Sequence, residues 1–288
     1  MSSPAYANPR RGLLYVAIAV IFFSTTPVFI RLAGSISSYE IAFWRLLVAA
    51  LVIRGAMLVK GERRTISRPE WRLFAIFGLI TALHFLFYIA SLSFTTIAHS
   101  LAIVYTAPIF VTLFSAIFLG ESIARRKWLG ILLAVVGVGI LAGFQPNFSK
   151  SMLFGDLLAL GSAITFGLYS VAGRSQRDSH SLFTYAMTIY GAAALWALLP
   201  AALSFTPGGY TPITILSVIA LGVLPLGIGH TLYNAALRYT HATYVNVIAT
   251  QEVTGGIILG IIFLGETPAT NEIVGVVITL LGILTVIL

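Results

Sequence analysis

The chain has 288 residues, of which 58% are hydrophobic and only 9% are charged, and it contains no cysteine. A soluble domain carries roughly 25% charged residues, so the charges here are too few to cover a water-exposed surface. The net charge of +8 lies in short loops, which indicates membrane orientation rather than nucleic-acid binding. The apolar runs are long and unbroken, unlike the alternating strands of a barrel, and predict a polytopic α-helical membrane protein.

Five membrane spans are predicted in the first half of the chain. Residues 12–30 carry no charge and exceed the apolar core of a signal peptide, so they are interpreted as a retained first span. Residues 39–59 form the second span. Residues 73–120 contain no Asp, Glu, Lys or Arg and must turn once, at the polar stretch 91–100, to give spans three and four. Span five is predicted at 128–143.

The second half is also predicted to contain five spans. Span six covers residues 157–173. Residues 181–237 are free of charge, and the proline- and glycine-rich stretch 207–212 divides them into spans seven and eight. Spans nine and ten are predicted at 242–264 and 273–288, which makes ten spans in all.

Basic residues separate sharply between the two sides of this map. With the N-terminus inside, the outer side holds only Arg31 and Lys150. The residues on the inner side are Arg10, Arg11, Lys60, Arg63, Arg64, Arg68, Arg72, Arg125, Arg126, Lys127, Arg174, Arg177 and Arg238. Cytoplasmic loops are enriched in Lys and Arg, so both termini are predicted in the cytoplasm and the protein in the inner (plasma) membrane.

The chain contains an internal repeat. The segment Phe-Leu-Gly-Glu at 118–121 recurs at 263–266, an offset of 145 residues, and Arg31 matches Arg174 at an offset of 143. Further matches at offset 145 pair Tyr88 with Tyr233, Ala90 with Ala235, Leu92 with Leu237, Thr95 with Thr240, Gly130 with Gly275 and Gly137 with Gly282. Two five-helix repeats are therefore predicted, 1–146 and 147–288. Because five is odd, the second repeat enters the membrane inverted, a design of secondary transporters.

Several of these features together resemble the drug/metabolite transporter superfamily, EamA family. They are the ten spans, a glycine nine residues after Glu121 and after Glu266, and an arginine after aromatic residues in 43–45. Within the family the chain looks most like YddG-type exporters of aromatic and neutral amino acids. The resemblance implies a basket of ten helices in which spans three, four, eight and nine line a central cavity.

Polar groups within the predicted spans are the candidate functional residues, since ionisable groups inside a membrane are energetically costly and often mark functional sites. Glu252, in span nine, is either a proton site or ammonium ligand, or a structural carboxyl. Arg45, in span two, is expected to pair with Glu40 rather than to bind a carboxylate. The substrate-binding candidates, each of which has interhelical hydrogen bonding as its alternative, are His84, Tyr88, Tyr105, Thr106, His230, Tyr233, Asn234, Asn246, Gln251 and Glu252.

Prolines and glycines within the spans have structural interpretations. Pro27, Pro108 and Pro225 each remove a helix hydrogen bond and are hinge candidates, with static kinks as the alternative. The glycines expected to permit close helix packing are Gly130, Gly137, Gly275, Gly282, Gly255, Gly256 and Gly260. Glu121 and Glu266 are expected to anchor helix ends or loops.

Missing motifs narrow the function further. The chain has no nucleotide-binding loop, no metal-ligand spacing and no nucleophile elbow, so no cofactor, no metal and no enzymatic activity are predicted. Spans three, four, seven, eight and ten carry no Lys or Arg, which disfavours a phosphorylated substrate.

The resulting hypothesis is a secondary exporter of small neutral or aromatic amino acids and related metabolites by alternating access. The alternative is an exporter of lipophilic cations with Glu252 as the anionic anchor, and a receptor or intramembrane enzyme is disfavoured because no output domain or catalytic constellation is visible. The expected partners are the substrate and the lipid bilayer, without nucleic acid, and a monomer is sufficient because the duplication supplies the antiparallel pair.

Overall fold

Every regular element that the structure describes is a helix, as predicted. The computed structural model describes residues 8–62, 66–67, 70–95, 97–141, 143, 149–255, 258–259 and 269–288. The stretches long and apolar enough to cross a membrane are Pro9–Leu32, Ser38–Val59, Glu70–Ser91, Ala102–Leu119, Lys150–Ser175, Leu182–Leu203 and Pro212–Tyr239. A shorter apolar helix covers Ile273–Ile287. Seven candidate spans are thus described, and the count of ten stays a prediction.

The helices follow the predicted order along the chain. Those of the first half are α1 (Pro9–Phe23), α2 (Thr26–Leu32), α3 (Ser38–Val59), α4 (Glu70–Ser91), α5 (Ile97–Val104), α6 (Ala107–Leu119) and α7 (Arg125–Leu141). Those of the second half are α8 (Lys150–Ser175), α9 (Leu182–Leu203), α10 (Pro212–Leu221), the π-helix η1 (Gly222–His230), α11 (Thr231–Tyr239), α12 (Ala242–Ala249) and α14 (Thr270–Ile287).

Local sequence signals set several helix ends. The Ser37 hydroxyl accepts a hydrogen bond from the Glu40 amide, and the Glu40 carboxylate accepts one from the Ser37 amide, which forms a capping box at the start of α3. At the other end of a span, α6 stops at Gly120, whose φ of 65° is a left-handed conformation that glycine adopts without strain. Capping thus places the span ends at hydrogen-bonding residues rather than within the apolar runs.

Three predicted spans are interrupted, and each of the three hinge-candidate prolines lies at an interruption. Residues 24–25 separate α1 from α2, where Pro27 occupies the first turn. Residues 105–106 separate α5 from α6, where Pro108 occupies the first turn. Pro225 lies inside η1, whose π-helical turns join α10 to α11. A proline removes a backbone donor, so these breaks have an identifiable local cause.

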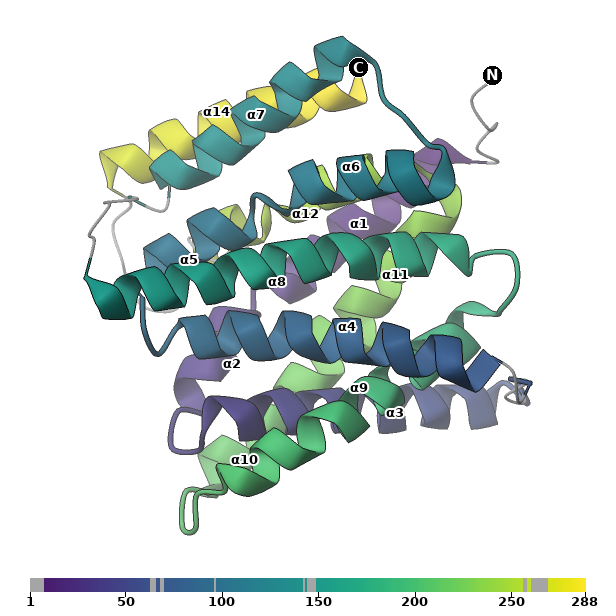
Figure 1. Cartoon of the computed structure of the whole chain (residues 1–288), viewed down its shortest axis with the longest axis vertical. Coiled ribbons are helices and arrows are strands. Elements are labelled where there is room, and N and C mark those ends of the chain that lie inside the picture. The colour runs from purple at the N-terminus through teal and green to yellow at the C-terminus, as the bar shows by residue number, and fades with distance from the viewer. Residues whose placement is uncertain are drawn as a thin grey trace.

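Helices α7 and α14 lie side by side at one edge of the molecule (Figure 1). Their backbones approach closely because small residues face each other: a Cβ atom on Gly137 would lie 2.5 Å from the amide nitrogen of Thr279. The glycines whose predicted close packing is confirmed are Gly130, Gly137, Gly275, Gly282 and Gly255. Gly256 and Gly260 lie outside the described residues, as does the second Phe-Leu-Gly-Glu segment with Glu266.

The core lies among the remaining helices, where α4 packs against both α8 and α9 and α3 packs against α9 (Figure 1). Several of its largest side chains are tyrosines, and Tyr169, Tyr190 and Tyr233 are completely buried. By contrast, Leu195 is 74% exposed and Ile21 is 66% exposed. An apolar outer surface of this kind requires lipid around it, whereas the polar groups lie inside.

Candidate functional site

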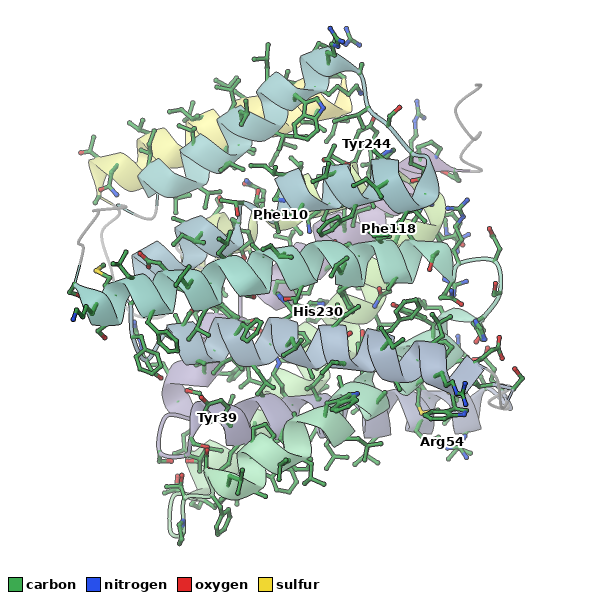
Figure 2. All side chains as sticks on the ribbon, viewed as in Figure 1. Tyr39, Arg54, Phe110, Phe118, His230 and Tyr244 are labelled. Atoms are coloured by element: carbon green, nitrogen blue, oxygen red, sulfur yellow. The ribbon has the colours of Figure 1, made fainter. Side chains whose placement is uncertain are left out.

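A pocket lies between the helices of both halves of the chain. It contains about 510 Å³ of space that protein atoms do not fill, its open side included. The residues that line it are Phe23, Thr26, Arg45, His84, Phe85, Tyr88, Val104, Tyr105, Phe166, His230, Ala249 and Glu252. Figure 2 shows one of them, His230, near the middle of the helix bundle.

Two groups of opposite charge face this pocket from different helices. Arg45, on α3, is only 2% exposed, and its guanidinium carbon lies 4.4 Å above the centre of the Phe85 ring. The Nε atom of Arg45 is buried without a hydrogen-bond partner among the described residues. Glu252 lines the same pocket just after the end of α12. Among the described residues these two side chains form no ion pair within 4.0 Å, although both line the same pocket.

The prediction that Arg45 pairs with Glu40 is wrong. The Glu40 carboxylate instead accepts hydrogen bonds from the Thr206 hydroxyl, at 2.7 Å, and from the Tyr210 hydroxyl. Five residues separate Glu40 from Arg45, so they project from different faces of α3. The structure therefore brings a cation into the pocket that sequence reasoning did not place there.

Glu252 and Tyr105 both line the pocket. Tyr105 occupies the break between α5 and α6, and Glu252 follows the turn at 250–251 that ends α12. Both groups therefore lie where a helix is interrupted. Helix breaks within a membrane are places at which transport proteins bind polar ligands.

Aromatic rings form the rest of the wall. The His84 ring stacks on Phe166 with 4.6 Å between ring centres and 12° between planes. His84 is held by Ser162, whose hydroxyl lies 2.9 Å from its Nδ1 atom. His230 contacts Phe23 and Phe85 at centre-to-centre distances of 4.5 and 5.3 Å. Such a wall suits a ligand with an apolar or aromatic part.

Five of the predicted substrate-binding residues line the pocket, namely His84, Tyr88, Tyr105, His230 and Glu252. Three others join helices to each other instead. The Asn246 amide donates to the Tyr233 hydroxyl at 3.1 Å, and the Asn234 amide donates to the Tyr169 hydroxyl at 2.6 Å. These buried bonds match the structural alternative that the sequence analysis left open.

Thr106 and Gln251 also lie apart from the pocket lining. The Thr106 hydroxyl donates to the carbonyl of Ile103, and Gln251 accepts a hydrogen bond from Thr254 at 3.0 Å. Gln251 instead contributes to a second, mainly apolar pocket beside α1. A small change of rotation about a helix axis decides which of two neighbouring residues faces a cavity.

The lining residues that the sequence did not point to are Phe23, Thr26, Arg45, Phe85, Val104, Phe166 and Ala249. One signal for two of them was present in the chain. Phe23 and Phe166 are separated by 143 residues, the same offset that relates Arg31 to Arg174. Phe23 and Phe166 both contribute rings to the one pocket.

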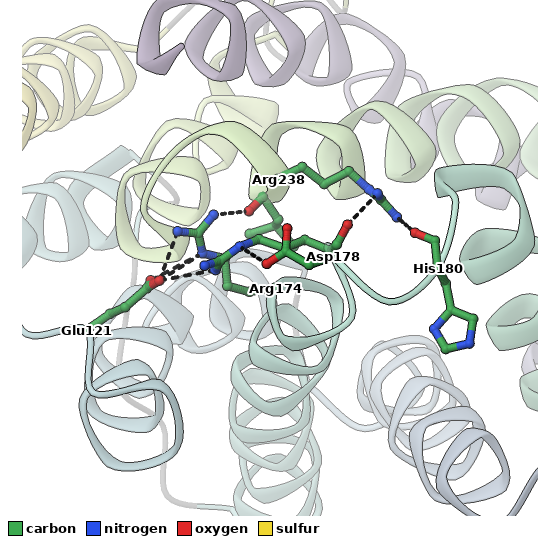
Figure 3. Close-up of polar contacts among 7 residues, drawn as sticks. Glu121, Arg174, Asp178, His180 and Arg238 are labelled. Carbon is green, nitrogen blue, oxygen red and sulfur yellow. Dashed lines mark hydrogen bonds and ion pairs between the residues drawn. The ribbon is translucent and has the colours of Figure 1, made fainter. Parts of the chain in front are cut away.

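A buried ion pair ties three helix ends together away from the pocket (Figure 3). The Glu121 carboxylate, directly after α6, accepts hydrogen bonds from Nε and Nη2 of Arg174 on α8 at 3.1 and 2.8 Å. Arg174 also donates to the carbonyl of Leu237 on α11, and Arg177 lies 3.3 Å from the same carboxylate. This arrangement agrees with the prediction that Glu121 anchors a helix end.

These features define a polytopic helical membrane protein with a small-molecule pocket at its centre, which is the class of the membrane transporters. Comparison with known families gives the particular group. The model of the EamA-like transporter family matches residues 10–143 and again residues 153–288, so the chain belongs to that family. It is therefore a multi-pass membrane transporter of a small molecule and not an enzyme.

Individual relatives agree with this assignment. The chain is 25% identical to an uncharacterized transporter of Archaeoglobus fulgidus over 96% of each chain. It is 27% identical to the pseudopaline exporter CntI of Pseudomonas aeruginosa over 92% of each chain. A solved crystal structure superposes with a TM-score of 0.83 over 95% of each chain at 21% identity, a likeness that shows the fold.

Proposed function

We propose that this protein is a secondary transporter that exports small neutral or aromatic amino acids and related metabolites across the cytoplasmic membrane by alternating access. The observation that carries the proposal is the pair of opposite charges, Arg45 and Glu252, in one pocket with aromatic walls. A zwitterion offers a carboxylate to Arg45 and an ammonium to Glu252. Its side chain then packs against the rings of His84 and Phe166.

The electrostatics favour a zwitterion over other substrates. Charges buried in a low-dielectric site need partners, and an amino acid supplies one for each. A phosphate ester brings two negative charges, against the single guanidinium of Arg45 and beside the carboxylate of Glu252. A lipophilic cation satisfies Glu252 but repels Arg45, so the lining opposes the cation alternative.

Several observations support an inverted repeat and hence alternating access. The family model matches the chain twice. The helix break at 105–106 and the turn at 250–251 are 145 residues apart, the offset of the repeat. Phe23 and Phe166 occupy matching positions and line the same pocket. If each repeat has five spans, the pocket lies between two antiparallel halves, each of which can expose it to one side in turn.

The proposed orientation places both termini in the cytoplasm. The start of α1 contacts the end of α11, since the Arg11 guanidinium lies 4.9 Å from the centre of the Tyr239 ring. The start of α7 contacts the end of the chain, since Arg126 donates to the carbonyl of Leu288. Helix α1 is thus antiparallel to α11 and α7 to α14, and each of these ends carries a basic residue, which supports a positive-inside topology.

Counterflow in proteoliposomes tests the substrate class. Purified protein is reconstituted with unlabelled amino acid inside, and uptake of labelled amino acids is measured across a panel of aromatic, aliphatic, acidic and basic side chains. We expect transient, saturable uptake of neutral and aromatic members. Decarboxylated amines and N-acetylated acids, which each lack one charge, serve as controls and should compete weakly.

Two results would overturn the proposal. One is the absence of saturable exchange for every amino acid in protein that remains folded. The other is saturable exchange of lipophilic monovalent cations that amino acids do not inhibit, which would establish the cation alternative.

A further inference from the structure

We infer that the Glu252 carboxylate binds the substrate ammonium and a proton in alternation, so that export of each zwitterion is coupled to the entry of one proton. This inference rests on the proposed function and adds the coupling mechanism. It starts from the geometry of the pocket: Glu252 lines it beside the neutral side chain of Tyr105, and the carboxylate has no ion-pair partner among the described residues. Such a group gains a partner from either a proton or an ammonium.

Among the described residues, five other titratable or charged side chains line the pocket with Glu252. Arg45 comes from α3, His84 and Tyr88 come from α4, Tyr105 comes from the break before α6, and His230 comes from η1. The guanidinium of Arg45 already rests on the face of the Phe85 ring, a cation–π contact that stabilises its charge when the pocket is empty. Arg45 therefore does not need Glu252 to stay ionised.

The two histidines are poorly placed to bind and release the coupled proton. His84 is engaged through Nδ1 with Ser162 and stacks on Phe166. His230 is wedged between Phe23 and Phe85. A charged imidazolium at either position would face the guanidinium of Arg45 across the pocket. Glu252 is thus the group whose proton occupancy changes the charge of the site with the least repulsion.

Competition for one carboxylate gives a definite charge balance. In the export step the ammonium pairs with the Glu252 carboxylate and the substrate carboxylate pairs with Arg45. On release, the ammonium–carboxylate contact breaks and the carboxylate takes a proton from the outer solution, forming an O–H bond. The transporter with protonated Glu252 then returns to its inward-facing state and releases the proton to the inside. A zwitterion has no net charge, so each cycle carries one positive charge inward.

The charge balance is measured on the native protein. Proteoliposomes are given either an acidic interior, or an interior-positive potential set with valinomycin and potassium, and accumulation of labelled amino acid is followed. We expect each gradient alone to drive uptake, because protons leaving the vesicle carry charge outward. Accumulation that follows the pH gradient but ignores the potential would overturn the inference, since it indicates no net charge movement.

The failure of coupling is distinguishable from the failure of the proposed function. Saturable counterflow together with insensitivity to both gradients means a facilitator, which overturns the coupling and leaves the amino-acid transporter intact. If no amino acid of the panel shows counterflow, the proposed function itself is overturned.

The variant Glu252→Gln provides a second test of the inference in the same uptake assay. The amide cannot exchange a proton, so we expect exchange at weaker apparent affinity that responds to neither gradient. Asp178→Asn is the matched control, since Asp178 is 84% exposed and lies outside the pocket, and it should keep coupled uptake. Glu252→Asp keeps a carboxyl group and should retain coupling. Gradient-driven accumulation by the Gln variant would overturn the assignment to Glu252.

Discussion

Arg174 and Glu121 form a buried ion pair that joins α8 to the end of α6, with 2.8 Å between Nη2 and Oε1. Their side chains are 1% and 4% exposed, so neither charge has water as a substitute partner. Arg174 also donates a hydrogen bond to the carbonyl of Leu237, which brings α11 to the same point. The ion pair and this hydrogen bond hold three helices together at an end of the molecule that is rich in basic residues.

Breaking this pair from one side should destabilise the protein strongly. Glu121→Gln leaves a buried guanidinium without its carboxylate, a change that typically costs about 3–5 kcal/mol. We expect a clear fall in the unfolding temperature in detergent, followed by fluorescence-detected size exclusion after heating. Asp178→Asn is the control, because it removes an exposed carboxylate that pairs with Arg177 and should change little. Equal stability of the two variants would contradict the structural role of Glu121.

Removing both charges should be milder than removing one. The double variant Glu121→Leu with Arg174→Met replaces the pair by apolar side chains, which often restores stability because no charge is left uncompensated. We expect its unfolding temperature to lie above that of Glu121→Gln.

The α7–α14 contact should tolerate no added side chain at its glycines. Gly137→Ala places a Cβ atom 2.5 Å from the backbone nitrogen of Thr279, and overpacking of this kind costs about 1–3 kcal/mol. Gly139→Ala is the matched control on the same helix, where a Cβ atom meets no described atom within 4 Å. Since Ala favours helix by up to about 1 kcal/mol over Gly, the control should be neutral or stabilising. The same heating assay separates the two.

Arg45 should determine recognition of the substrate carboxylate. Arg45→Gln removes a charged hydrogen-bond donor, worth about 1.5–3 kcal/mol, so amino-acid affinity in counterflow competition should fall about 10- to 100-fold. Decarboxylated amines should be affected far less, because they have no group for Arg45 to bind. Arg54→Gln is the control on the same helix, and Figure 2 shows Arg54 at the outer edge of the molecule. Equal losses for acids and amines would contradict the assignment.

Phe166 should set the preference for aromatic side chains. Its ring stacks on His84, and aromatic pairs contribute about 0.5–1.5 kcal/mol beyond burial. Phe166→Leu should therefore reduce the preference for aromatic over aliphatic amino acids by roughly 2- to 12-fold in competition counterflow. Phe118→Leu, at a ring that is 63% exposed, is the control and should leave the preference unchanged.

Tyr210 should make stability depend on alkaline pH. Burial raises the pKa of its hydroxyl above the ordinary value of 10.0, and the hydrogen bond to Glu40 raises the pKa further. A raised pKa in the folded state stabilises the fold below pH 10, and that contribution is lost as the pH rises through the folded pKa. Tyr210→Phe should thus lower stability by about 1–2 kcal/mol at pH 8 and by less above pH 10.

The control for that experiment is Tyr39→Phe, since the tyrosine hydroxyl that donates to Glu40 is that of Tyr210 and not that of Tyr39. Tyr39→Phe should change the stability at pH 8 much less than Tyr210→Phe does. A Tyr210→Phe difference that grows above pH 10 would contradict the sign of the argument.

Composition, hydropathy and loop charge determined much about this protein by themselves. A chain with 9% charged residues must be covered by lipid, and lipid requires helices or a closed barrel, so the all-helical class followed from the residues. The packing of Gly137 and Gly275 and the anchoring role of Glu121 were also predicted, because small residues and helix-end acids have few other uses in a membrane.

The tertiary structure decided which polar groups meet. Helices that are apolar on every side carry no amphipathic pattern to show which face turns inward. Rotation about the helix axis therefore put Glu252 into the pocket and left its neighbour Gln251 out of the lining, and it turned Asn234 and Tyr233 toward other helices. The same packing brought Arg45 from α3 into the pocket that Glu252 lines, a combination of charges that neither residue's local sequence indicates.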